Sequence, residues 1–150
     1  MAKTAPKKVD KDKSKAAPTA EVVPVPIMLW QSEPDNHDYP AAESYLSLLT
    51  TTAQAKKLVA RLKKAPIVMH PAKDILRSAQ LDLLPMDDAA VVRDITKVAQ
   101  GMKLSPVLIM RGDYTTGTPL VIADGYHRVC SSYHLSENEL IPCRIIDATI

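Results

Sequence analysis

The spacing of hydrophobic positions changes character several times along this chain of 150 residues. Between residues 38 and 64, apolar residues recur every three or four positions, which is typical of amphipathic helices. The pattern predicts a first helix that begins near a capping residue, Asp38, and carries Tyr45, Leu48 and Leu49 on its apolar face.

A second helix is predicted in TTAQAKKLVARLKKA, residues 51–65, with Thr51 or Thr52 as its cap. Its apolar face carries Leu58, Val59 and Leu62. Lysines and arginines occupy the other face, where they either lie in solvent or face a phosphate backbone. The two helices predict a helical hairpin within residues 27–65 that packs on the rest of the chain.

From residue 66 onward, short apolar runs alternate with amphipathic stretches. The apolar runs predict strands at 67–70, 105–110, 119–123 and 140–146. The amphipathic stretches predict helices at 71–79, 89–100 and 125–135. Asp87 or Asp88 is expected to cap the second of these helices, and Gly101 to end it. The turn-forming residues 111–118 join two of the strands as a hairpin, so we predict an α/β (α+β) fold with a small mixed sheet in residues 66–150.

Composition limits the classes of protein that remain. Hydrophobic residues make up 46% and charged residues 24% of the chain, as in ordinary soluble domains. No apolar run approaches the ~20 residues of a membrane span, and the lysine-rich start lacks the apolar core of a signal peptide. Cys130 and Cys143 do not make a disulfide framework, so we expect a cytoplasmic protein without membrane partners.

The charge is distributed unevenly. Residues 1–20 hold six lysines and two aspartates, a charge of +4, so the other 130 residues carry −2 from 13 basic and 15 acidic side chains. The body is therefore not basic, unlike a typical DNA-binding domain. Residues 1–26 lack periodicity, and we predict a disordered Lys/Pro-rich arm. The arm is a solubilising tail or, as the alternative, a tether to nucleic acid.

The sequence ADGYHRVCSSYHL, residues 123–135, holds the candidate site. It places His127 and Arg128 in the first turn of a predicted helix, although the partial positive charge there disfavours cations. An anion would explain the placement, because Gly125 lets a ligand approach the backbone and the helix start offers free N–H groups. The alternative is structural: Asp124 caps the helix and Arg128 pairs with a nearby carboxylate.

The same helix argues against several kinds of chemistry. One of its faces is expected to belong to the core and carries Tyr126, Val129, Cys130 and Tyr133. Cys130 is therefore interpreted as a buried apolar residue and not as a nucleophile. His127 and His134 are two turns apart, too far to bind one ion together. The sequence predicts no metal site and assigns no catalytic residue.

Residues 105–146 resemble the superfamily of the ParB N-terminal domain and sulfiredoxin. The resemblance lies in the order of Pro106, two strands, the DGYHR box, a helix and the final strand IPCRII, and it extends over about residues 66–147. It implies that the box binds the phosphates of a nucleotide. Sulfiredoxins carry a catalytic cysteine where this chain has Tyr126, so sulfinic-acid repair is not expected.

The resemblance implies a phosphate site made of Asp124, Gly125, Tyr126, His127 and Arg128. The expected function is phosphate or nucleotide binding, with slow nucleotide hydrolysis as a further step and a nucleoside triphosphate with Mg²⁺ as the ligand. Two alternatives stay open: a non-catalytic regulatory or interaction module, and nonspecific nucleic-acid binding or cleavage through the lysine-rich arm. Removal of Arg128 is expected to abolish ligand binding and leave the fold intact.

Overall fold

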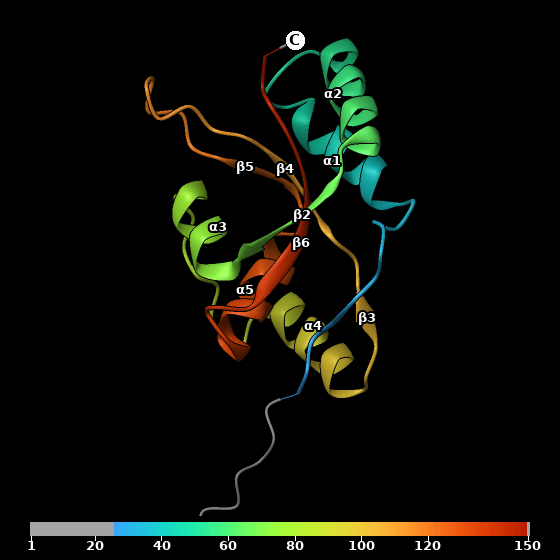
Figure 1. Cartoon of the computed structure of the whole chain (residues 1–150), viewed down its shortest axis with the longest axis vertical. Helices are drawn as coiled ribbons and strands as arrows, with labels where there is room; N and C mark the ends of the chain where they lie inside the picture. Colours follow the sequence, from blue (N-terminus) through green and yellow to red (C-terminus); the bar gives the residue numbers. More distant parts are fainter. Residues whose placement is uncertain (1–25, 150) are drawn as a thin grey trace, which may run out of the picture.

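A computed structural model describes residues 26–149, and it shows an α/β protein with five helices and two sheets in that part of the chain. Figure 1 shows their arrangement. The helices are α1 (Asp38–Leu46), α2 (Thr52–Lys64), α3 (Ala72–Ala79), α4 (Ala89–Ala99) and α5 (Tyr126–Leu135). The strands are β1 (Leu29–Trp30), β2 (Ile67–Pro71), β3 (Lys103–Leu104), β4 (Val107–Met110), β5 (Val121–Asp124) and β6 (Leu140–Ile146). The predicted disordered arm, except for Pro26, lies outside the described residues.

The main sheet is mixed, with strand order β2-β6-β4-β5. The last strand of the chain, β6, lies in its interior, antiparallel to β2 and parallel to β4. β4 and β5 form the predicted hairpin, which closes through paired backbone bonds between Asp113 and Thr118. A separate parallel pair joins β1 to β3. This pair was not predicted, because two-residue strands leave no periodic signal.

The two faces of the sheet are covered by different helices. Along β4, Val107 and Ile109 point to one side and Leu108 to the other, as the pleat of a strand requires. Val107 and Ile109 pack with α3, α4 and α5 in one aliphatic core, whereas Leu108 packs with α1 and α2 in a second core. β4 is thus buried on both faces, which explains its uninterrupted apolar run, whereas the middle of the edge strand β2 is exposed.

Most predicted elements are confirmed. The final strand matches its predicted bounds, and Thr51 and Asp88 cap their helices by accepting bonds from backbone N–H groups. One helical face was predicted wrongly: Tyr45, Leu48 and Leu49 are exposed. The helix ends at Leu46, so the last two residues lie beyond it.

The face of α1 that is buried carries Tyr39, Ala42 and Leu46. The expectation that Asp38 caps this helix is also wrong, because His37 is the N-cap residue and its side chain makes no capping bond. Asp38 is the buried first residue of α1, and its side chain contacts Ser105 and Arg128. In the described residues 26–149, no helix is both long and apolar enough to cross a membrane.

Candidate functional site

The candidate box lies where β5 passes directly into α5. Gly125 joins the two elements with a φ of 112°, a left-handed conformation that favours glycine. A Cβ atom at this position would lie 2.9 Å from a methyl carbon of Val107. Only glycine therefore lets the chain turn this tightly over β4, and among the described residues no side chain caps the N-terminus of α5.

Arg128 is enclosed by partners from three parts of the chain. Its Nη2 donates to Asp124 at the end of β5. Its Nη1 donates to Asp38 of α1 at 3.2 Å and to the carbonyl oxygens of Ser105 and Pro106 at 2.7 and 3.2 Å. Only 12% of the side chain is exposed. The guanidinium therefore holds α1, α5 and the segment before β4 together. This confirms the alternative prediction that Arg128 pairs with a nearby carboxylate. The other half of that alternative is wrong, because Asp124 does not cap the helix.

Asp38 extends this network. Its Oδ2 accepts the Ser105 hydroxyl as well as the Arg128 guanidinium. The same Ser105 hydroxyl oxygen accepts the backbone N–H of Asp35 at 3.0 Å. The loop before α1 is thus fixed against the segment before β4. The sequence offered no signal for this arrangement, because Asp38 and Arg128 belong to segments that local patterns treat separately.

A cavity of about 450 Å³ opens beside the network. Four of the five predicted site residues line it: Asp124, Gly125, His127 and Arg128. The fifth, Tyr126, is not among the lining residues. Its hydroxyl donates to the carbonyl oxygen of Asp82, and its ring packs on the core of α3 and α5. The structure therefore brings most of the box to one cavity and turns Tyr126 away from it.

The cavity also gathers basic residues that sequence reasoning missed. Arg93 and Lys97 come from α4 and Lys103 from β3, and all three line the cavity together with exposed His127. Arg93 and Lys97 are four positions apart, so they lie on one face of α4. That spacing was a usable signal. What the pattern could not show is that this face turns toward the start of α5.

Four aspartates balance the four arginines and lysines of the cavity: Asp35, Asp38, Asp94 and Asp124. Burial raises the pKa of Asp124 to about 6, although the Arg128 guanidinium opposes the shift. Burial likewise raises the pKa of Asp94 above its usual range, against the pull of Arg128 and Lys97. Both carboxyl groups thus tend toward the neutral form, which leaves the cavity more positive as the pH falls.

One group of side chains has the composition of a metal site. Asp35, His37 and Asp38 each offer a ligand atom, and these atoms lie within 4.8 Å of one another. The Oδ2 of Asp38 is engaged by Ser105 and Arg128, whereas its Oδ1 faces the Nε2 of His37 at 3.4 Å. None of these three residues was predicted as a ligand from the sequence. Carboxylate oxygens of this kind suit a hard divalent cation such as Mg²⁺.

The remaining side chains of the helix are structural. Cys130 is fully buried, as predicted, and burial raises the pKa of its thiol. A ring nitrogen of His134 lies 2.6 Å from the carbonyl oxygen of Leu84, which ties α5 to the loop before α4. Ser131 donates to the carbonyl oxygen of His127 one turn earlier. Among these residues, only His127 reaches the cavity.

The geometry can therefore hold an anion at the start of α5, between exposed cations, with carboxylates nearby for a divalent ion. Comparisons with known proteins found no matching family model, no similar curated protein and no similar solved structure.

Proposed function

We propose that the 450 Å³ cavity binds a phosphate-bearing ligand, with a nucleoside triphosphate as the first choice, and that the chain is a ParB/sulfiredoxin-like binding protein. The observation that carries the proposal is the convergence of Arg93, Lys97, Lys103 and His127 on the uncapped N-terminus of α5. Backbone N–H groups at a helix start and nearby cations are the two features that phosphate oxygens need. The cavity volume lies within the ~300–1,000 Å³ range of small-molecule sites.

The roles of the box residues differ in this proposal. Gly125 lets a phosphate oxygen reach the first N–H groups of α5. His127 is exposed at the rim and donates from its ring. Arg128 shapes the wall and is less suited to direct contact, since its terminal nitrogens already bond to Asp38, Asp124 and two carbonyl oxygens. The cations of α4 and β3 therefore make most of the charged contacts with the phosphate in this proposal.

A divalent cation fits the same picture. A nucleoside triphosphate enters a site as its Mg²⁺ complex, and Mg²⁺ takes carboxylate oxygens alongside phosphate oxygens. Asp35 and the Oδ1 of Asp38, which faces the His37 ring, are the carboxylate oxygens we assign to it. Slow hydrolysis of the nucleotide is a further step that the proposal permits but does not require.

A second function is favoured by the Arg128 contacts. Because the guanidinium is satisfied inside the protein, the box serves the fold without any ligand. In that case the chain is a non-catalytic regulatory or interaction module, and the cations of α4 remain solvated. The two proposals differ in whether the cavity binds phosphate at all.

Calorimetry decides between them. The full chain is titrated with ATP, CTP, GTP, UTP and pyrophosphate in the presence of Mg²⁺, and compared with the double variant Arg93→Gln/Lys97→Gln. Loss of two charge-assisted contacts is expected to weaken binding by about tenfold or more. The matched control is Lys56→Gln/Lys57→Gln, which removes the same charge from exposed positions of α2 outside the cavity.

Equal affinity of the α4 double variant and the wild type would remove the phosphate proposal. Absence of binding by every one of these ligands would also remove it and favour the interaction module. A third outcome is tested with single-stranded DNA: if both double variants lose DNA affinity equally and the loss depends steeply on salt, binding follows overall charge and the nucleic-acid alternative holds.

A further inference from the structure

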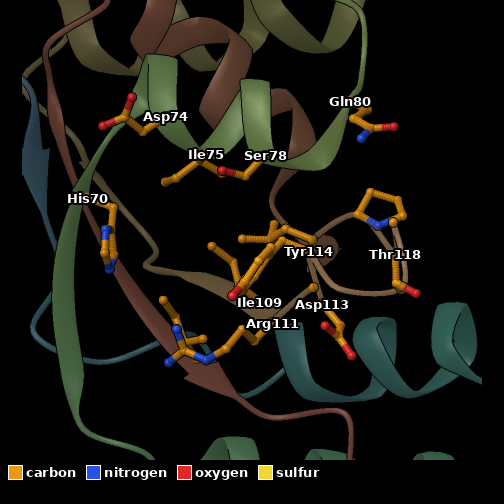
Figure 2. A pocket seen from close by; sticks show the side chains of 15 residues that line it. His70, Asp74, Ile75, Ser78, Gln80, Ile109, Arg111, Asp113, Tyr114 and Thr118 are labelled. Carbon is orange, nitrogen blue, oxygen red and sulfur yellow. The ribbon is translucent and has the colours of Figure 1, made fainter.

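A second and larger cavity, of about 610 Å³, lies between α3 and the β4–β5 hairpin and shares no lining residue with the phosphate cavity. Figure 2 shows it from close by. Its floor is aliphatic and consists of Ile75 of α3, Ile109 of β4, Ile145 of β6 and Leu120. These residues belong to the edge of the core that β4, β6 and α3 share, where the core opens toward solvent.

The walls of this cavity are fixed by backbone bonds. Asp113 and Thr118 exchange two backbone bonds of 2.9 and 3.0 Å across the β4–β5 hairpin. The N–H of Leu120 donates to the carbonyl oxygen of Ser78 at 3.0 Å, which fastens the hairpin to α3. The hairpin and α3 therefore form opposite sides of a preformed pocket, and a ligand meets little ordering cost there.

Three charged side chains lie around the pocket, and two of them, Asp74 and Arg111, are in exposed ion pairs. Arg111 donates from Nε to Asp147 at 2.8 Å, and Asp74 accepts from Arg77 at 3.1 Å. Asp113 accepts from the backbone N–H and the hydroxyl of Thr115, and Figure 2 shows its carboxylate turned away from the middle of the pocket. The aliphatic floor itself carries no charged side chain among the described residues, which favours an uncharged ligand.

Donors and acceptors remain available at the rim. The imidazole of His70, the hydroxyl of Ser78 and the amide of Gln80 line the pocket, and all three residues are exposed. Arg111 lies on the same side of the view as His70. A ligand that fits these groups has an apolar body and carries both donors and acceptors on its edge.

The exposed ring of Tyr114 indicates that the apolar body of the ligand is flat. It lies at the hairpin tip with 95% of the residue exposed, although an aromatic ring is normally more covered. Figure 2 shows its side chain in the middle of the view, between α3 and Arg111. The ring packs against no core cluster of the described residues, so one face is free for stacking. A flat ring between Tyr114 and the isoleucine floor would cover both apolar surfaces at once.

We infer that this pocket is a binding site for an uncharged planar heteroaromatic molecule, with a ring of nucleobase or pyridine size stacked on Tyr114 and its edge bonded to the rim residues. The site is separate from the phosphate cavity and does not depend on it. The ligand class follows from three features together: the aliphatic floor, the lack of charged side chains on that floor and the exposed tyrosine.

Binding is tested by NMR titration of the full chain with labelled isoleucine methyl groups. Adenosine is expected to shift the methyl signals of Ile75, Ile109 and Ile145, whereas ribose, which lacks the ring, is not. Tyr114→Ala is expected to weaken adenosine binding by about tenfold, and Tyr114→Phe to keep it, because stacking needs the ring and not the hydroxyl. Tyr45→Ala removes another exposed tyrosine, on α1, and is expected to change nothing.

The charge of the ligand is tested with three compounds of one ring. Nicotinamide is neutral, nicotinate is an anion and 1-methylnicotinamide, methylated on the ring nitrogen, is a cation, and the neutral compound is expected to bind most tightly. The variant Arg93→Gln/Lys97→Gln is expected to bind adenosine as the wild type does, so this test and the phosphate test fail independently. The inference is overturned if Tyr114→Ala binds adenosine unchanged, if ribose gives the same shifts, if a charged compound binds best, or if adenosine leaves the three methyl signals unmoved.

Discussion

Arg128 and Asp38 are 90 positions apart in the sequence, and a 3.2 Å ion pair joins them in the fold. The pair connects the first turn of α5 with the first residue of α1, and Asp124 shares the same guanidinium. Removal of Arg128 would leave two carboxylates facing each other in a poorly solvated place. The expectation that Arg128 can be removed without cost to the fold is therefore replaced by the opposite one.

The first prediction concerns this network. Arg128→Met is expected to lower the free energy of unfolding by about 3 kcal/mol, because it leaves Asp38 and Asp124 without their counter-ion. Urea denaturation followed by circular dichroism measures the change. Arg77→Met is the matched control: its pair with Asp74 is exposed, and its loss is expected to cost less than about 1 kcal/mol. Similar costs for the two variants would contradict a central role of Arg128.

The second prediction concerns pH. Burial raises the folded-state pKa of Asp124 from 3.8 to about 6, so the folded protein binds this proton more tightly than the unfolded chain does. The contribution of this group to stability is therefore greatest at low pH and is lost as the pH rises through about 6. Relative to the wild type, Asp124→Asn is expected to gain stability between pH 4.5 and 7.5. A difference that is independent of pH would show that Asp124 titrates normally.

The third prediction separates two reasons why a position requires glycine: a left-handed backbone and a lack of space for a Cβ atom. Gly125→Ala is expected to destabilise the protein by about 2–4 kcal/mol, because it combines a left-handed backbone with a clash against Val107. Gly117→Ala shares the positive φ but meets no atom within 4 Å, so its cost is expected to be about 1 kcal/mol. Thermal unfolding of both variants gives the comparison. A larger loss for Gly117→Ala would mean that the tight passage over β4 is not important.

The fourth prediction concerns the thiols. Burial raises the pKa of Cys143 to about 12 and that of Cys130 above its usual range, and both side chains are inaccessible. Neither thiol is expected to react with a disulfide reagent at pH 8 in the folded protein, because the thiolate is the reactive form. Both are expected to react once urea unfolds the chain. Rapid labelling of the native protein would show that the core around α5 and β6 opens readily.

Local patterns were sufficient for most of the secondary structure. Within residues 26–149, the alternation of apolar runs and amphipathic stretches located every strand of the main sheet and every helix, since burial imposes a period on each element separately. The caps at Thr51 and Asp88 were found because a cap acts on its own helix. The glycine and the basic pair at the start of α5 were found for the same reason, as an anomaly within one turn.

Only the tertiary structure decided which residues surround Gly125, His127 and Arg128 at the start of α5. It placed Asp38 against Arg128, turned Tyr126 toward the core and brought the basic face of α4 to the start of α5. It also opened the pocket beneath Tyr114 between α3 and the hairpin. These relationships depend on how elements pack and on the strand order β2-β6-β4-β5, which a periodic signal does not encode, because periodicity records that a face is buried and not which partner buries it.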